Sequence, residues 1–342
     1  MAEKLTVAIV GAGQIAGGYD RHKLNDDGIY THAGAYVKDG RFQLQTVVDL
    51  DIAKAQDFLQ EWQVNSATAC LEDIYQAYHD VISVCTPDAT HYEIITDLIE
   101  KQSCRTIFAE KPLALRIDEI NALACLAREQ NVNLVINFQR QFDPVHAGIQ
   151  QMLATRMDKL LAVNAFYMKG LEHNGITMID TLIFLCGVPR AVYAFNRVFN
   201  QQVNAYTYEF ILFYDTFNIT VKTVDTESSV YNYHIFEIDL LLADGRVTLN
   251  DNSRQVVSRS IVAFAYSGVN VLNDQKPDHT PTEFKFSMLA AINYIHQITS
   301  GMKPHAINTP EMSSVNKIIV DRIILSFDKK TKIEIGDMSW IR

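Results

Sequence analysis

Two glycines near the start of the chain are spaced so that the backbone could approach a phosphate. Gly11 and Gly13 directly follow an apolar run, in the pattern Gly-x-Gly-x-x-Ala. The first permits a sharp strand-to-helix turn, the second allows close approach of a pyrophosphate, and Ala16 allows the helix to pack tightly. The amides of Gln14 and Ile15 would then face the phosphates. These residues predict a dinucleotide-binding turn, although a simple glycine turn also fits them.

An acidic residue ends the next apolar run. Asp49 follows the run at 44–48. A carboxylate at this point can bind both ribose hydroxyls of an adenosine, and its charge repels a 2′-phosphate. We therefore expect NAD rather than NADP as the cofactor. The alternative is that Asp49 or Asp51 only caps the helix starting near Ile52; both roles are compatible if Asp51 is the cap.

Polar and charged residues also follow the next two apolar runs. Thr86 and Pro87 end one run, and His91 lies in the first turn of the helix that follows. Glu110 and Lys111 end the other. Ligands of open α/β sheets bind in the crevice beyond the carboxyl ends of the strands, so these residues are candidates for cofactor contacts. For His91, a capping or core histidine is an equally good interpretation.

Apolar runs alternate with helical patterns from residue 4 to 138. This alternation predicts a doubly wound parallel sheet, with strands at 7–10, 44–49, 80–86, 106–109 and 132–137. Helices are expected from about 52, from 88–91 and over 117–130. The polar run 20–28 interrupts the first helix. It predicts an inserted loop, either a lid over the cofactor or a solvated excursion.

The pattern changes from about residue 190. Runs at 205–214, 218–224 and 230–242 alternate apolar and polar residues, and 243–245 predicts a hairpin turn. They indicate an antiparallel sheet with one face covered by a helix or by another subunit. Helical patterns follow at 284–298 and 309–326. We divide the chain into a Rossmann domain, 1–138, and a second α/β domain, 139–342, leaving open whether the last helix packs on the first domain.

Composition narrows the possible classes. The 342 residues are 48% hydrophobic and carry a net charge of −10, which favours a two-domain globular protein and disfavours nucleic acid or an anionic membrane as partners. No apolar run approaches the ~18 residues of a membrane span. The first strand begins too early for a signal peptide, so we expect a soluble, cytoplasmic protein. Five scattered cysteines, never in Cys-x-x-Cys spacing, predict neither disulfides nor a metal site.

The chain resembles the glucose–fructose oxidoreductase / inositol dehydrogenase (Gfo/Idh/MocA) family over essentially its full length. The resemblance rests on the glycine turn and on the residues that follow the strand ends: Asp49, Thr86, Pro87, His91, Glu110, Lys111 and Pro112. It implies a Rossmann domain followed by a domain with a large open, mainly antiparallel sheet. That sheet commonly forms subunit contacts, which implies a homodimer or homotetramer. Members mostly oxidise a hydroxyl of a sugar, inositol or sugar nucleotide with NAD(P).

Oxidation of a secondary alcohol needs a hydride acceptor, a base and a fixed geometry between them. The resemblance places Lys111 against the nicotinamide ribose and the reacting hydroxyl, where its charge would stabilise developing alkoxide. A solvated lysine beside Glu110 is the alternative. The resemblance also suggests a cis peptide bond before Pro112.

The expected base departs from the family pattern. Apolar residues between 176 and 186 predict a helix ended by Gly187, with positions 173 and 177 one turn apart at its start. The family usually carries Asp and then the catalytic His at these positions, whereas this chain has His173 and Thr177. A threonine hydroxyl is not a base near neutrality, but an imidazole with a pKa of about 6.5 is suited to the role. Relatives that read His-Asn-Gly-Ser-His here are often linked to surface-polysaccharide sugars, which suggests a sugar-nucleotide branch.

Three interpretations follow. In the first, His173 is the base, Thr177 orients the substrate, and the substrate is bound by Arg140, Lys169 and Asn174. Lys111 and His173 should then converge on one carbon above the pyridine ring. In the second, the chain is a non-catalytic dinucleotide- and sugar-binding regulator, because the usual catalytic histidine is Thr177. The third, reduction of a non-sugar carbonyl or imine, uses the same cofactor site.

Overall fold

The computed structural model describes residues 3–21, 27–225, 234–263, 269–273 and 277–338. They form two compact units. Unit 1 comprises Met1–Asp143 and Lys285–Ser314, and unit 2 comprises Pro144–Phe284 and Val315–Arg342. The expected division at 138/139 lies close to the first of these boundaries. The segment Lys285–Ser314 differs, because it belongs to unit 1 although the prediction assigned it to the second domain.

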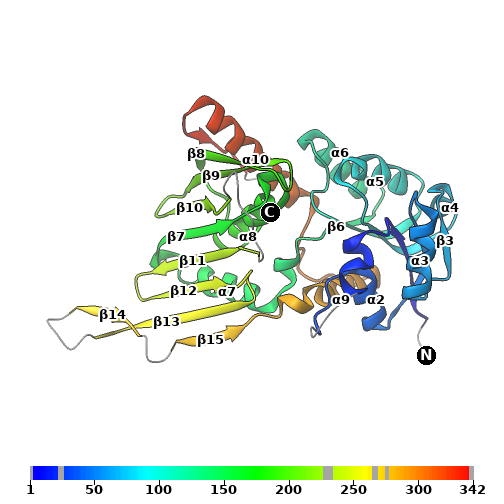
Figure 1. Cartoon of the computed structure of the whole chain (residues 1–342), viewed down its shortest axis with the longest axis horizontal. Helices are drawn as coiled ribbons and strands as arrows, with labels where there is room; N and C mark the ends of the chain where they lie inside the picture. Colours follow the sequence, from blue (N-terminus) through cyan, green and yellow to red (C-terminus); the bar gives the residue numbers. More distant parts are fainter. Residues whose placement is uncertain (1–2, 22–26, 226–233, 264–268, 274–276, 339–342) are drawn as a thin grey trace. The chain divides into compact units, whose positions relative to one another are not determined.

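Unit 1 is built on a six-stranded parallel sheet, seen edge-on in Figure 1. In spatial order its strands are β3 (Ser66–Thr68), β2 (Phe42–Val48), β1 (Leu5–Val10), β4 (His79–Val84), β5 (Cys104–Ala109) and β6 (Asn133–Ile136). The order 3-2-1-4-5-6 is that of a Rossmann fold. The central strands are buried on both faces, which explains why they read as continuous apolar runs. The predicted doubly wound sheet is confirmed.

Helices connect these strands. They are α1 (Tyr19–Arg21), α2 (His32–Asp39), α3 (Ile52–Trp62), α4 (Glu72–Tyr75), α5 (His91–Glu100) and α6 (Ile117–Glu129). Part of the predicted insert, 22–26, lies outside the described residues. The rest of it leads directly into α2, which Thr31 caps by accepting a hydrogen bond from the Gly34 amide.

A helix from late in the sequence completes the core of unit 1. Helix α9 (Ser287–Thr299) contacts α2 and the short helix η3 (Gln139–Phe142), and Figure 1 shows it beside α2. Its residues Met288, Ala291, Ile292 and Ile295 are fully buried in the same apolar cluster as β1. This burial is the reason that the segment 285–314 joins unit 1.

Unit 2 is built on a ten-stranded mixed sheet. Its path is β14 (Asn270–Leu272), β13 (Gln255–Ala263), β12 (Gly245–Asn250), β11 (Glu237–Leu242), β7 (Leu160–Tyr167), β10 (Asn218–Thr223), β9 (Ala205–Phe213), β8 (Ala191–Asn200) and β16 (Ile333–Glu334), with β15 (Asp278–Pro281) paired to β13. Strands β7 and β10 are parallel, and the other pairs are antiparallel. The hairpin predicted at 243–245 is present between β11 and β12. Of the predicted run 230–242, only 237–242 is strand, and 230–233 lies outside the described residues.

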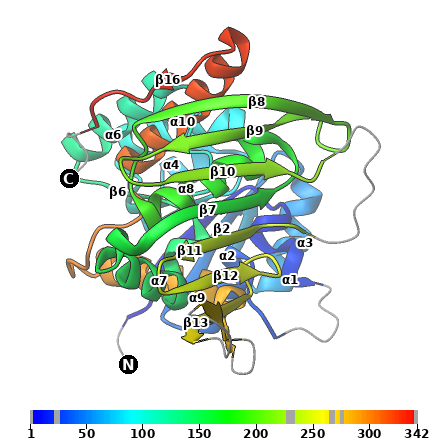
Figure 2. The ribbon, with the colours of Figure 1, turned by 90° about the vertical axis from the view of Figure 1, so that its left-hand side faces the viewer.

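Helices cover one face of this sheet. Figure 2 views the sheet face on, with α7 (Pro144–Ala154), α8 (Ile176–Cys186) and α10 (Pro310–Lys329) behind it. Inward side chains such as Phe210 and Leu240 are fully buried, whereas those that alternate with them on the other face are only half-buried. Within the described part of the chain, no helix combines the length and apolar character needed to cross a bilayer.

Candidate functional site

The glycine turn after β1 has the features expected of a phosphate cradle. Gly11 has φ +94°, and a Cβ there would lie 2.7 Å from the Cys85 carbonyl oxygen, so only glycine fits. A Cβ on Gly13, by contrast, would meet no atom within 4 Å. The space beside Gly13 is therefore open to a ligand, and the residues present fit a bound pyrophosphate.

The segment after the turn is a π-helix, η1 (Gln14–Gly18), rather than the expected start of an α-helix. Gly13 precedes it, so the amides of Gln14 and Ile15 lie at its start. Ala16 is fully buried, as its predicted packing role requires. Turns of this type occur often at functional sites.

The two acidic residues after β2 have separate roles. Asp49 Oδ2 accepts a hydrogen bond from the Ala12 amide at 2.9 Å, inside the glycine turn. Asp49 Oδ1 accepts one from the Asp51 amide at 3.0 Å. Asp51 caps α3 by accepting from the Ala53 amide, as predicted for the cap. Each Asp49 oxygen keeps a further lone pair, which leaves capacity for ribose hydroxyls.

His91 contacts the backbone at two strand exits. Its fully buried ring places Nε2 2.9 Å from the Thr86 carbonyl oxygen and Nδ1 2.8 Å from the Pro112 carbonyl oxygen. The ring therefore joins the segment after β4 to the segment after β5. These contacts fit the core histidine that the sequence left open, and a role of His91 in cofactor binding stays a prediction.

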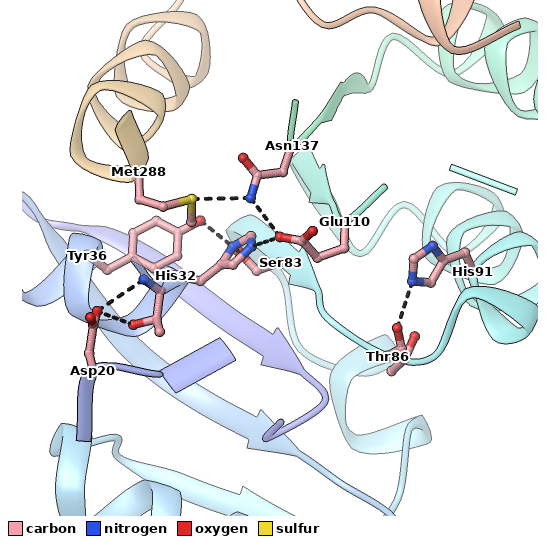
Figure 3. Close-up of polar contacts among 10 residues, drawn as sticks. Asp20, His32, Tyr36, Ser83, Thr86, His91, Glu110, Asn137 and Met288 are labelled. Carbon is pink, nitrogen blue, oxygen red and sulfur yellow. Dashed lines mark hydrogen bonds and ion pairs between the residues drawn. The ribbon is translucent and has the colours of Figure 1, made fainter. Parts of the chain in front are cut away.

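Glu110, at the carboxyl end of β5, lies in a buried polar cluster, shown in Figure 3. Its Oε1 accepts hydrogen bonds from His32 Nε2 at 2.9 Å and from Asn137 Nδ2 at 2.6 Å. His32 Nδ1 lies 3.0 Å from Ser83 Oγ, which lies 2.9 Å from the Tyr36 hydroxyl. We call these five residues the Glu110 cluster. They come from α2, β4, β5 and the segment after β6, so the cluster joins four parts of unit 1.

Burial and the charges around Glu110 and Lys111 shift the pKa of both groups. Burial acts to raise the pKa of Glu110, but the His32 and Asn137 hydrogen bonds and the Lys111 charge lower it overall. Burial lowers the pKa of Lys111, and the positive charge of Arg140 adds to this effect. The negative charges of Glu110 and Asp88 oppose it. The Lys111–Pro112 peptide bond is cis, as the family resemblance suggested.

In unit 2, the predicted base lies on an unusual turn. His173 and Asn174 belong to a π-helix, η5 (Gly170–Gly175), and α8 begins only at Ile176. The prediction that positions 173 and 177 are one α-helical turn apart is therefore corrected: the π-turn between them changes that spacing. The His173 side chain is exposed, and Asn174 and Thr177 are half-buried.

A buried carboxylate holds the start of this turn. Lys169 and Gly170 both have positive φ, at 65° and 85°. The Lys169 amide donates to Asp225 Oδ2 at 2.8 Å, and the Gly170 amide donates to Thr207 Oγ1 at 2.8 Å. Thr207 and Asn200 also donate to Asp225, which is only 4% exposed. Asp225 thus fixes the backbone from which His173 projects.

The match to a known protein family lies within unit 1. Residues 5–138 match the model of the Gfo/Idh/MocA oxidoreductase family, which has an NAD-binding Rossmann fold. Residues 5–138 of this chain therefore resemble the NAD-binding domain of that family. A myo-inositol dehydrogenase, Hyg17 of Streptomyces leeuwenhoekii, is 29% identical over 146 residues, which are 43% of this chain and 40% of that protein. An uncharacterized oxidoreductase, YrbE of Bacillus subtilis, is 25% identical over 145 residues, 42% of this chain and 38% of that protein.

The chain matches about two fifths of the length of these curated relatives. Its fold likeness extends further. A levoglucosan dehydrogenase, solved in complex with NADH and levoglucosan, superposes with a TM-score of 0.77 at 14% identity, covering 98% of this chain and 100% of that chain. At this identity the likeness establishes the fold, which is shared along nearly the whole chain.

Several residues of the site were not found by sequence reasoning. His32, Ser83 and Asp225 lie far in sequence from the groups that they contact, and no motif marks them. Lys111 and Arg140 lie in unit 1 with the cofactor residues, and His173 and Lys169 lie in unit 2. Among the residues that the structure describes, no group of three or more His, Cys, Asp or Glu side chains could hold a metal ion.

Proposed function

We propose that this protein is an NAD-dependent oxidoreductase that acts on a secondary hydroxyl of a sugar, sugar nucleotide or cyclitol. The observation that carries the proposal is the edge of the unit 1 sheet. There the glycine turn, Asp49, Thr86 and the Glu110–Lys111 pair all follow the carboxyl ends of neighbouring parallel strands. In open α/β sheets this edge is where dinucleotides bind.

The residues of this edge fit a nicotinamide dinucleotide. The open space beside Gly13 would take the pyrophosphate, and Asp49 would bind the adenosine ribose and disfavour a 2′-phosphate. Thr86, Pro87 and Glu110 would line the nicotinamide half. When bound, the dinucleotide supplies the hydride acceptor that protein side chains lack.

Side chains of this protein would stabilise the charge on the substrate oxygen and accept the hydroxyl proton. The Lys111 ammonium would stabilise negative charge as it develops on the substrate oxygen. The His173 imidazole would take the hydroxyl proton, with Thr177 orienting the substrate. Substrate binding is assigned to Arg140, Lys169 and Asn174, whose donors suit hydroxyl, carboxylate or phosphate groups.

The substrate class rests on the relatives and on the donors. One relative is a myo-inositol dehydrogenase, and one structural neighbour holds levoglucosan, so both act on or bind polyhydroxylated rings. Two candidate substrate residues, Arg140 and Lys169, are cationic. They favour a ring that carries an anionic group, as sugar nucleotides do.

Turnover tests the proposal directly. Reduced-cofactor absorbance is followed with NAD⁺ and a panel of cyclitols, sugars and nucleotide-linked sugars. We expect turnover on at least one of them, and Lys111→Met should lower kcat by about 100-fold or more because a transition-state donor is lost. The control is Lys101→Met, which removes a surface lysine paired with Asp97. Intact NAD⁺ binding without turnover on any member would contradict the proposal.

The assigned base has its own test. His173→Ala should abolish turnover at pH 7, whereas His279→Ala, at an exposed histidine of β15, should leave it unchanged. If the chain is instead a non-catalytic regulator, the wild type binds NAD⁺ and sugar without turnover, and Thr177→His does not create activity.

A further inference from the structure

The Glu110 cluster contains more hydrogen-bonding groups than are needed to bury one carboxylate. Its side chains span three elements and the segment after β6, and each is at most 9% exposed. His32 also packs on Phe108, with ring centroids 4.7 Å apart. The imidazole is thus held in place by packing and by a hydrogen bond at each nitrogen.

The donors and acceptors of the cluster form one consistent chain. An ionised Glu110 can only accept, so His32 must donate from Nε2. A neutral imidazole then accepts at Nδ1, which makes Ser83 the donor to His32 and the Tyr36 hydroxyl the donor to Ser83. Each of these three hydrogen bonds then has one donor and one acceptor.

The chain of hydrogen bonds ends inside the protein. Tyr36 is 1% exposed, and burial raises its pKa well above the ordinary value of a tyrosine. Among the described residues, the Tyr36 end of the chain therefore has no direct contact with solvent. The effect of the cluster is to fix the orientation and the charge of Glu110.

We propose that His32 and Asn137 are positioning residues for the candidate active site: they keep Glu110 as an oriented carboxylate, and this carboxylate keeps the neighbouring Lys111 ammonium charged. The inference rests on the proposed function, because a charged Lys111 matters there for stabilising the substrate oxygen. Burial of an ammonium favours its neutral form, so a compensating carboxylate is needed at this position.

The charged groups around the pair are few. Lys111 experiences the negative charges of Glu110 and Asp88 and the positive charge of Arg140. Glu110 accepts a hydrogen bond from His32 and experiences the positive charge of Lys111, and its own charge adds to burial in raising the pKa of the Cys85 thiol. Glu110 precedes Lys111 directly in the chain, and its carboxylate opposes the effect of burial on the Lys111 ammonium.

The test measures the two titrations without any turnover. Protein labelled with ¹³C at lysine Cε and glutamate Cδ is titrated by NMR, and the two signals are assigned with Lys111→Arg and Glu110→Gln. In Glu110→Gln, the Lys111 titration should move down by about one pH unit or more, because an adjacent opposite charge is lost. In His32→Phe, the Glu110 titration should move up by a similar amount, because the ring packing is kept and the donor is lost.

Two further variants separate this role from a general structural one. In His32→Gln, whose amide can donate to Glu110, the pH at which Glu110 titrates should return most of the way to the wild-type value. His79→Phe makes the same substitution at another buried histidine of unit 1 and should leave both titrations unchanged. If His32→Phe does not fold, Asn137→Leu carries the test with the same expected direction.

The outcome is independent of whether a substrate is found. The inference would be overturned if the pH at which Glu110 titrates is the same as in the wild type in both His32→Phe and Asn137→Leu. It would also be overturned if the pH at which Lys111 titrates does not change in Glu110→Gln. If the titrations shift as expected and no sugar is turned over, the proposed reaction fails while the coupling between the cluster and Lys111 stands.

Discussion

Asp49 shows how one carboxylate can serve the fold and, in the proposed function, a ligand as well. Its two oxygens hold the amides of Ala12 and Asp51, one in the glycine turn and one ahead of α3. The carboxylate is therefore oriented before any ribose arrives. A preorganised group of this kind loses little entropy on binding, which strengthens its contribution to cofactor choice.

We predict that Asp49→Ser narrows the preference for NAD⁺ over NADP⁺. The variant loses an acceptor for the ribose hydroxyls and a charge that repels the 2′-phosphate, so the ratio of the two dissociation constants should fall by about tenfold or more. Isothermal titration calorimetry with both dinucleotides measures it. Asp51→Asn, which keeps a good cap for α3, should leave the ratio unchanged. An unaltered ratio in Asp49→Ser would exclude Asp49 from cofactor discrimination.

At the scale of single elements, strand β4 begins with a buried histidine. His79 is 3% exposed, and neither of its ring nitrogens has a hydrogen-bond partner among the described residues. Burial lowers the pKa of His79, and the charge of Asp80 only partly opposes this. The unfolded chain therefore takes up a proton near pH 6.5 that the folded chain does not. The contribution of the neutral His79 to the free energy of unfolding is therefore fully present above that pH. It is lost as the pH falls below it.

We expect His79→Phe to remove part of the acid sensitivity of unit 1. Between pH 7 and 5.5 the wild type should lose about 1 kcal/mol of unfolding free energy through this residue, and the variant should not. Urea unfolding at the two pH values measures the difference. His305→Phe, at an exposed histidine, should behave as the wild type does. Equal acid sensitivity in all three proteins would show that His79 is not the cause.

The turn that precedes α8 depends on a residue more than 50 positions away. Asp225 accepts hydrogen bonds from the Lys169 amide, from Asn200 and from Thr207. Two consecutive residues with positive φ, Lys169 and Gly170, are held by this arrangement. Because Lys169 is not glycine, that backbone conformation needs support from its surroundings.

Asp225→Ala should destabilise unit 2 by about 3 kcal/mol, because three buried donors lose their acceptor. Thermal and urea unfolding measure the loss. If the variant remains folded, its turnover should also fall, since the backbone carrying His173 is released. The comparison is Asp239→Ala, which removes a partly exposed partner of Arg246 and should cost less than about 1 kcal/mol. Similar losses in the two variants would contradict the assigned role of Asp225.

At the scale of the whole molecule, the described residues place no helix on one face of the unit 2 sheet. Half-buried apolar side chains on this face, such as Phe166, Ile211, Phe213 and Leu241, alternate with the buried ones that face α8. Large contiguous apolar patches on a protein surface often mark interaction sites. This favours the homodimer or homotetramer proposed through the C-terminal sheet.

We predict that the molar mass of the protein in solution is at least twice the mass of one chain. Ile211→Glu, which places a charge in the centre of the open face, should shift it toward the monomer. Light scattering coupled to size exclusion measures both proteins. Leu115→Glu, at an exposed residue of unit 1, should not change the mass. A wild-type monomer would refute the oligomer, and an unchanged mass in Ile211→Glu would place the interface elsewhere.

Local patterns were enough to predict much of this protein. The parallel sheet, the glycine turn, the Asp51 cap and the residues beyond each strand end all follow from short-range chemistry, since strand burial, turns and caps depend on neighbours within a few residues. The same patterns placed Glu110 and Lys111 at the functional edge of the sheet. The prediction missed the π-helical form of the turns at Gln14 and Gly170, which composition does not distinguish from an α-helical start.

Only the tertiary structure decided what those residues contact. Helix α9 joins unit 1 although residues 137–286 separate it from β6, because its apolar face completes the core there. His32 reaches Glu110 across 78 positions, and Lys169 is held by Asp225 across 56. Such contacts leave no periodicity or spacing in the sequence. They arise because buried polar groups must find partners wherever the fold places them, and only the folded chain shows which partners those are.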